Sequence, residues 1–143
     1  MKVSFVMYGT LRKGQGRHEV LPTDKGTMEM VEISGYKMYA LRYGFPGVYP
    51  TNNPEDTFTA ELWTFDLTEK EAEKLVAVLD NIEGVAYNMY KREYIEVNGV
   101  TACIYVSNIP LDKGSIEIKD WNEYVKLANT IRREKGRSNE GTA

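Results

Sequence analysis

The amino-acid sequence predicts a single α+β domain, in which a small mixed and curled β-sheet or barrel packs against a few helices. Two observations support this fold class. Segments with the β-branched, aromatic and alternating pattern of strands fill the first half of the chain, and helical periodicity is confined to two later segments. Runs of strands with few helices are typical of α+β domains. A doubly wound fold is disfavoured, because strands and helices do not alternate and the sequence has no glycine-rich phosphate loop.

Six segments have the composition expected of strands: residues 3–8, 27–33, 36–41, 57–65, 88–97 and 100–106. The last two segments are joined by Asn98 and Gly99, the two residues that a type I′ hairpin turn prefers. The sequence therefore predicts an antiparallel hairpin at the end of the sheet-forming part of the chain.

Two helices are predicted by their start signals and their apolar faces. Thr68 and Glu71 match a capping box at the start of the first helix. Asp120 marks the start of the second helix, and Gly136 its end. The apolar faces are Ala72, Leu75, Val76 and Leu79 in the first helix and Trp121, Tyr124, Val125, Ala128 and Ile131 in the second. Small and polar residues follow, so we expect one folded domain over residues 1–135 and a disordered tail over residues 136–143.

Composition restricts the classes of function. The 143 residues include one histidine and one cysteine, so neither a zinc site nor a Ser-His-Asp triad is expected, and no cofactor is implied. A net charge of -3 gives no general attraction to nucleic acid. The apolar start of the chain is too short for a signal peptide or a membrane span. The lone Cys103 cannot form an internal disulfide, which favours a reducing compartment. From these observations together we expect a soluble cytoplasmic protein that has neither nucleic acid nor a membrane as a partner.

A first candidate site is the segment that follows the first strand, residues 8–12 with the sequence Tyr-Gly-Thr-Leu-Arg. A strand that runs into a glycine and a polar segment can expose successive backbone N–H groups as an anion-binding nest. The same residues also fit an ordinary turn, which the local sequence favours.

Glu83 is a second candidate, just beyond the predicted end of the first helix and flanked by Ile82 and Val85. Apolar neighbours disfavour the charged form of a carboxyl and raise its pKa toward the range useful in acid/base catalysis. The alternative interpretation is a solvated glutamate in the last helical turn, which the local sequence favours.

Aromatic residues supply a third set of candidates. Tyr90, Arg92 and Tyr94 share one face of a predicted strand, where the tyrosines either orient a polar substrate or cover a half-wet sheet face. Residues 45–50 form a rigid proline-containing loop, and Tyr49 within it either walls a pocket or belongs to a plain connection.

Glu61 and His18 are polar candidates with a similar ambiguity. Glu61 alternates with apolar residues, so it either points to solvent or adds a second carboxylate to a barrel. His18 either donates to a substrate or to the Tyr8 loop, or is an ordinary structural histidine, which is the commoner case.

Taken in order, five blocks of this sequence resemble the γ-glutamylcyclotransferase-like superfamily, which includes the plant avirulence-induced proteins and the γ-glutamylaminecyclotransferases. The blocks, spread over about residues 3–106, are residues 8–12 with Gly14 and His18; Gly35, Tyr36 and Tyr39 with residues 45–50; residues 60–63; residues 79–84; and residues 90–92. The chain departs from the family where Ala60 replaces the usual glycine and in the variable residues 85–89.

This resemblance implies the fold described above and an activity. In that activity the α-amine of a γ-glutamyl compound attacks its own γ-carbonyl, so that 5-oxoproline forms and an amine or amino acid leaves. Glu83 would be the general acid/base, which reverses the interpretation favoured by its local sequence. The backbone N–H groups of Gly9, Thr10 and Leu11 would hold the substrate's carboxylate or the oxyanion, and Tyr8, Tyr49 and Tyr90 would form walls and polar contacts.

Two alternatives stay open beside this activity. The chain could be a non-catalytic module that binds a small ligand on the same fold, or a relative that removes a γ-glutamyl protecting group. Arg12 is either a charge partner for a carboxylate or a surface residue. The identity of the released amine and the oligomeric state are not encoded in any of these motifs.

Overall fold

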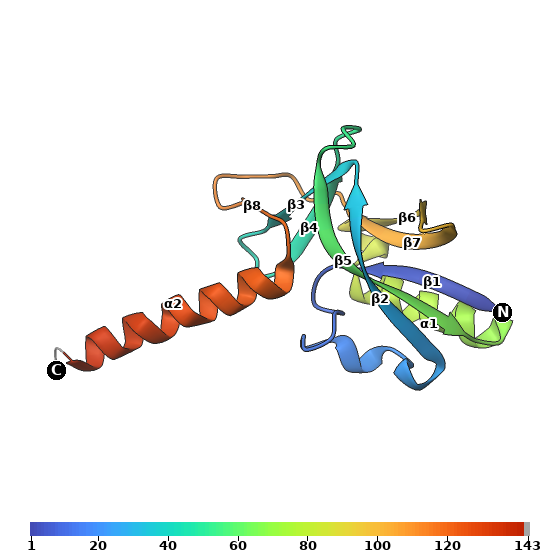
Figure 1. The fold of residues 1–143 in the computed structure, drawn as a ribbon, viewed down its shortest axis with the longest axis horizontal. Helices are drawn as coiled ribbons and strands as arrows, with labels where there is room; N and C mark the ends of the chain where they lie inside the picture. Colours follow the sequence, from blue (N-terminus) through green and yellow to red (C-terminus); the bar gives the residue numbers. More distant parts are fainter. Residues whose placement is uncertain (142–143) are drawn as a thin grey trace.

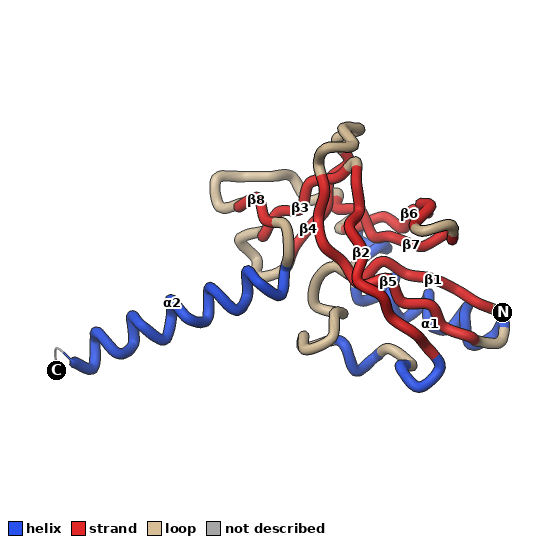
Figure 2. Tube along the Cα trace, in the orientation of Figure 1, coloured by secondary structure: helices blue, strands red, loops and turns tan. Residues whose placement is uncertain are grey.

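The structure is a computed structural model that describes residues 1–141, with side-chain burial described for residues 1–135. Its strands form a five-stranded sheet of order β2-β5-β1-β7-β6 and a three-stranded sheet of order β4-β3-β8, red in Figure 2. The strands are β1 (Lys2–Met7), β2 (Gly26–Ser34), β3 (Tyr36–Ala40), β4 (Pro46–Pro50), β5 (Thr57–Asp66), β6 (Tyr90–Val97), β7 (Val100–Ser107) and β8 (Ile116–Ile118). The predicted α+β class is confirmed. The barrel alternative is wrong, because the strands are divided between two sheets instead of closing on one another.

Both faces of the five-stranded sheet are covered at its central strand β1, whose successive side chains point to opposite faces. On one face, Phe5 and Met7 of β1 pack with Leu75 from α1 (Glu69–Ile82). On the opposite face, Val6 packs with Val48 from the three-stranded sheet. The central strand β1 runs antiparallel to β5 and parallel to β7, so its C-terminal end lies deep in the fold.

The predicted local signals at the hairpin and at α1 are confirmed. Asn98 and Gly99 have φ angles of 50° and 81°, the left-handed conformations that a type I′ turn needs at both positions. The Thr68 hydroxyl accepts from the Glu71 N–H, and the Glu71 carboxylate accepts from the Thr68 N–H, which completes the capping box.

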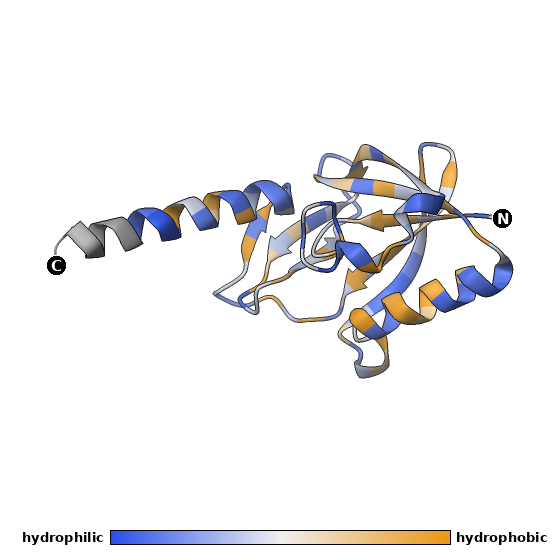
Figure 3. Ribbon diagram, turned by 90° about the horizontal axis from the view of Figure 1, so that it is seen from below, coloured by the Kyte–Doolittle hydropathy of each residue, from blue (hydrophilic) through white to orange (hydrophobic). Residues whose placement is uncertain are grey.

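The second helix, α2 (Trp121–Gly141), packs on the body only at its start and projects away from it (Figure 1). Trp121 is buried, whereas Leu127 and Ile131 are 60% and 47% exposed, so Ile131 does not join the buried face that the periodicity predicted. Figure 3 shows hydrophobic and hydrophilic residues alternating along the coloured part of α2. Within the described residues, neither helix carries an apolar stretch long enough to cross a membrane.

The predicted end of α2 at Gly136 is wrong, because the helix continues to Gly141. A glycine within a helix costs only about 1 kcal/mol relative to alanine, so it does not by itself stop one. Residues 142–143 lie outside the described residues, and the disorder expected for the tail over 136–143 stays a prediction.

Residues 46–50 were predicted as a loop and instead form strand β4, which pairs antiparallel with β3. Pro46 and Pro50 are its first and last residues, and β4 is an edge strand, where the missing proline N–H leaves no ladder bond unmade. The three-residue strand β8 and the 3-10 turns η1 (His18–Val20), η2 (Thr23–Lys25) and η3 (Val85–Tyr87) had no sequence signal strong enough to predict them.

Candidate active site

A cavity of about 340 Å³ opens at the C-terminal end of β1, where the first candidate segment meets the end of α1. This volume suits a small molecule. The cavity is lined by Val6, Met7, Tyr8, Gly9, Thr10, Leu11, Arg17, Tyr43, Gly44, Phe45, Pro46, Ile82, Glu83, Met89, Tyr90 and Tyr105. Of the residues to which the resemblance assigns a role, the structure places all except Tyr49 at this cavity. The other candidates do not line it: Arg12, His18, Glu61, Arg92 and Tyr94.

We call residues 8–13 the site loop; it forms a tight turn, in which the Arg12 N–H donates to the Gly9 carbonyl at 3.0 Å. The backbone N–H groups of Gly9, Thr10 and Leu11 have no acceptor among the described residues. A Cβ on Gly9 would lie 2.6 Å from Cγ of Pro46, so only glycine fits there. The turn thus places three backbone N–H groups without an acceptor at residues that line the cavity, an arrangement suited to an anion.

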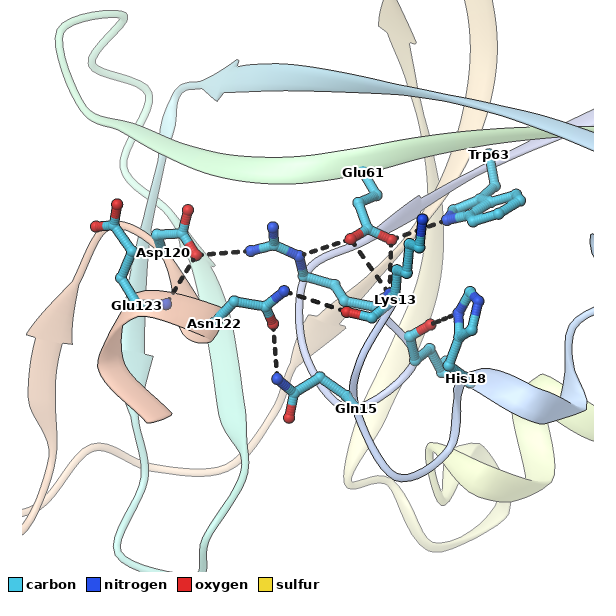
Figure 4. Close-up of polar contacts among 10 residues, drawn as sticks. Lys13, Gln15, His18, Glu61, Trp63, Asp120, Asn122 and Glu123 are labelled. Carbon is cyan, nitrogen blue, oxygen red and sulfur yellow. Dashed lines mark hydrogen bonds and ion pairs between the residues drawn. The ribbon is translucent and has the colours of Figure 1, made fainter. Parts of the chain in front are cut away.

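The outer side of the site loop is held by Glu61, which is 2% exposed. Its carboxylate accepts from the Lys13 N–H at 3.0 Å, from Trp63 Nε1 at 3.0 Å and from Arg12 Nε at 3.1 Å, as Figure 4 shows. Of the two interpretations of Glu61, neither solvent exposure nor a second carboxylate in a barrel applies. It is a buried anchor for the backbone of the loop.

The start of α2 holds the same loop from a second direction (Figure 4). Arg12, which is 4% exposed, donates from Nη1 to the Asp120 carboxylate at 2.8 Å. The Asn122 side chain accepts from Gln15 at 2.8 Å and donates to the Lys13 carbonyl at 3.3 Å. The α2 helix, which lay outside the motifs read from the sequence, is thus joined to the site through its first turn.

Glu83 caps the C-terminus of α1, and its N–H donates to the Leu79 carbonyl at 2.9 Å. Gly84 follows with a φ of 64°, which turns the chain and leaves the Glu83 side chain at the cavity. Its carboxyl has no hydrogen-bond partner among the described residues and is partly buried. Burial raises the pKa of Glu83 to about 7, although the nearby positive charge of Arg17 lowers it in part.

The tyrosines of the cavity donate their hydroxyl protons to backbone carbonyls. The Tyr8 hydroxyl donates to the Tyr105 carbonyl at 2.6 Å, and the Tyr90 hydroxyl to the Pro46 carbonyl at 2.5 Å. Burial, with the Glu83 charge as a further cause, raises the pKa of both phenols well above its usual range. Both therefore stay protonated and present ring faces and acceptor lone pairs to a ligand.

Tyr49 lies elsewhere, because its hydroxyl donates to the Ile109 carbonyl at 2.7 Å and accepts from Ser107 at 3.0 Å. Tyr49 lies in β4 and does not line the cavity, whereas Tyr90 does. The Nδ1–H group of His18 donates to the Leu11 carbonyl at 3.0 Å, so His18 supports the site loop instead of lining the cavity.

The structure adds cavity residues that the sequence analysis did not select, among them Arg17, Tyr43, Met89 and Tyr105. Tyr43 stacks on Phe45 with ring centroids 6.0 Å apart. Arg17 lies in a turn, and Met89 lies in a bend just before β6, although residues 88–97 were predicted as a strand. Neither position carried a sequence signal for the cavity. In the described part of the chain no group of three or more His, Cys, Asp or Glu side chains is placed to hold a metal ion.

Comparison with known proteins identifies the family of the chain. Residues 5–123 match a family model described as γ-glutamyl cyclotransferase, AIG2-like. Because the match covers most of the chain, the chain belongs to this family. The resemblance read from the motifs is confirmed, and the family supports a cyclotransferase-like activity in general. No curated protein matches the chain.

Three solved structures share the fold. An uncharacterized protein from Pyrococcus horikoshii, PH0828, has a TM-score of 0.67 and 19% identity, with 90% of this chain and 96% of that chain covered. The protein c4763 of uropathogenic Escherichia coli has a TM-score of 0.67 and 17% identity over 88% and 97% of the two chains. YkqA from Bacillus subtilis has a TM-score of 0.64 and 22% identity over 91% of this chain and 43% of its own. At these identities the likeness shows the fold alone.

Proposed function

We propose that this protein is a γ-glutamyl cyclotransferase in which Glu83 is the general acid/base. The single observation that supports the proposal is that the Glu83 carboxyl, with a pKa of about 7, shares its cavity with three backbone N–H groups that have no acceptor among the described residues. A group that titrates near neutral pH can both accept and return a proton at little cost. The backbone donors suit the negative charge of a γ-glutamyl substrate.

In the proposed reaction the substrate supplies its own nucleophile. Ionised Glu83 takes a proton from the α-ammonium, and the freed amine attacks the γ-carbonyl carbon, so that a C–N bond forms and closes the five-membered ring. The γ-amide C–N bond then breaks, Glu83 returns the proton to the departing nitrogen, and the ring nitrogen passes its second proton to the released amine, which leaves as an ammonium. The products are 5-oxoproline and an amine or amino acid. Holding the γ-glutamyl chain curled supplies the proximity that such a ring closure needs.

The site loop and the tyrosines divide the binding between them. The N–H groups of Gly9, Thr10 and Leu11 would hold the α-carboxylate or the oxyanion that develops on the γ-carbonyl oxygen. Tyr8 and Tyr90 would form the walls beside Glu83, since both line the cavity and both are affected by its charge.

The test is the release of 5-oxoproline from γ-glutamyl amino acids and γ-glutamyl amines, with Glu83→Gln beside the wild type. We expect the variant to lose about 100-fold or more of the turnover, the contribution of a positioned acid/base. Glu73→Gln is the matched control, because Glu73 lies exposed on α1 outside the cavity. Undiminished turnover in folded Glu83→Gln would contradict the role of Glu83.

A binding module without chemistry predicts a different result. In that case γ-glutamyl compounds or 5-oxoproline would raise the melting temperature of the wild type, yet no product would form in an end-point assay. That outcome would remove the enzymatic proposal and keep the cavity as a ligand site.

A further inference from the structure

The cavity contains two ionisable charges among its described lining residues, Glu83 and Arg17, and the proposed reaction uses only the first. The inference below rests on the proposed function. It concerns the leaving group, whose identity neither the motifs nor the family specifies.

Arg17 is held in place at both ends. Its backbone N–H donates to the Thr10 carbonyl at 2.9 Å, so that this bond closes the turn formed by residues 10–17. At its far end Nη1 donates to the Ile82 carbonyl at 3.4 Å. Ile82 directly precedes Glu83, so the guanidinium stands beside the acid/base.

Among the described residues, the remaining N–H donors of the Arg17 guanidinium have no hydrogen-bond acceptor. Among the side chains that the structure describes, no carboxylate lies within 4.0 Å of its guanidinium, whereas Arg12 has two such partners. A guanidinium with free N–H groups at a cavity wall is suited to a carboxylate, which it can bind through two parallel hydrogen bonds. Since the backbone donors of Gly9, Thr10 and Leu11 serve the glutamyl half of the substrate, Arg17 is available to the other half.

The position of the departing nitrogen decides where a second carboxylate would fall. That nitrogen must come within hydrogen-bonding reach of Glu83 to be protonated. In a γ-glutamyl α-amino acid, the carboxylate of the leaving group is attached to the carbon next to this nitrogen. It is therefore carried to the neighbourhood of the group that protonates the nitrogen, where Arg17 stands.

We propose that Arg17 is a specificity-determining residue that pairs with this carboxylate and selects γ-glutamyl α-amino acids over γ-glutamyl amines. The exposed apolar walls of the cavity indicate the side chain of the released amino acid. Tyr43 and Met89 are exposed by 55% and 38%, and with Phe45 and Ile82 they line the cavity. Such exposed apolar surface favours an apolar side chain.

The experiment compares γ-glutamylleucine with γ-glutamyl-3-methylbutylamine, which is the same compound without the leaving-group carboxylate. For each enzyme the ratio of kcat/KM for the two compounds is measured. We expect the wild type to prefer the carboxylate by about tenfold, the value of one hydrogen-bonded charge at an exposed site. In Arg17→Gln the ratio should fall to near one.

The ratio also separates selection from a simple effect on Glu83. Because Arg17 lowers the pKa of Glu83, its replacement changes the protonation of Glu83 for both compounds alike, and that change cancels in the ratio. Arg133→Gln is the matched control, since it removes the same charge at an exposed position of α2 outside the cavity. The control should keep the wild-type ratio.

Each outcome decides something different. Equal turnover of both compounds by the wild type, or an unchanged ratio in Arg17→Gln, overturns the role of Arg17 and leaves the cyclotransferase proposal standing. No 5-oxoproline from either compound overturns both. A third compound, γ-glutamylglycine, retains the carboxylate without an apolar side chain. If it is turned over as well as γ-glutamylleucine, the apolar part of the proposal is wrong.

Discussion

Arg12 and Asp120 are 108 residues apart in the chain, yet Nη1 of one lies 2.8 Å from the carboxylate of the other. Arg12 belongs to the site loop, and Asp120 caps the start of α2, where its carboxylate also accepts from the Glu123 N–H at 3.2 Å. The pair therefore couples the cavity wall to a helix whose remainder projects from the body (Figure 1).

Asp120→Asn should weaken binding of a γ-glutamyl substrate more than it weakens the chemical step. The substitution removes one of the two charges that hold the Arg12 guanidinium, so the site loop loses orientation. We expect KM to rise several-fold and the free energy of unfolding to fall by about 1 to 3 kcal/mol. Steady-state kinetics and urea unfolding check this, with the exposed Glu123→Gln as control. An unchanged KM would show that α2 does not position the loop.

Glu61→Gln should be the most destabilising single change in this network. Glu61 is 2% exposed and pairs with Arg12, so its neutralisation leaves one side of a buried charge unpaired. Breaking a buried pair in this way costs about 3 to 5 kcal/mol, of which Asp120 offsets a part. Urea unfolding measures the loss. Glu32→Gln, on the exposed side of β2, should differ from the wild type by less than about 0.5 kcal/mol.

Gly9→Ala should impair the site without any change in charge. The added Cβ would lie 2.6 Å from Cγ and 3.0 Å from Cδ of Pro46, and a proline ring has little freedom to move. The site loop must then shift away from β4, and its three free N–H groups shift with it. We expect kcat/KM to fall by about tenfold or more. Gly16→Ala is the control, because nothing lies within 4 Å of a Cβ there.

The pH dependence of kcat/KM should follow the ionisation of Glu83. Burial raises its pKa to about 7, and the reaction begins with the carboxylate form. Activity should therefore rise with pH through an apparent pKa near 7 and fall about tenfold per unit well below it. In Arg17→Gln the inflection should move to higher pH, since a charge that lowers the pKa is lost. A profile that is flat from pH 5 to 8 would contradict the role of Glu83.

Stability should depend on pH in the opposite sense. The pKa of Glu83 is higher in the folded protein than its ordinary value of 4.5, so the folded state binds the proton more tightly. The stabilisation that results is complete below pH 4.5 and is lost as pH rises through 7. Relative to the wild type, Glu83→Gln should gain about 1 to 3 kcal/mol between pH 4 and pH 8.5. Urea unfolding at the two pH values measures this, and Glu73→Gln should show no such gain.

Short-range physics made much of the fold predictable from the sequence. The Asn98-Gly99 turn and the Thr68–Glu71 capping box depend on residues next to one another, and both form as predicted. The predicted α+β class is likewise confirmed, because alternation and helical spacing are local properties. The end of α2 could not be predicted from Gly136, because the small cost of one glycine is outweighed by the helix-forming residues on either side of it.

Glu83 shows what the sequence by itself predicted about the site. Its place in an ordered set of motifs indicated a role that its neighbours did not, and the family of the chain is confirmed. Its environment needed the structure, because the pKa of a carboxyl depends on how much of its surroundings excludes water.

Only the tertiary structure decided which other residues meet at the cavity. Arg17 and Met89 reach it from irregular turns, Tyr49 is directed away from it by its place in β4, and Glu61 proves to be a buried anchor. Such outcomes depend on contacts between residues far apart in the chain, which no local pattern encodes. The sequence therefore determined most of the elements and the family, while long-range packing decided which residues line the cavity beside Glu83.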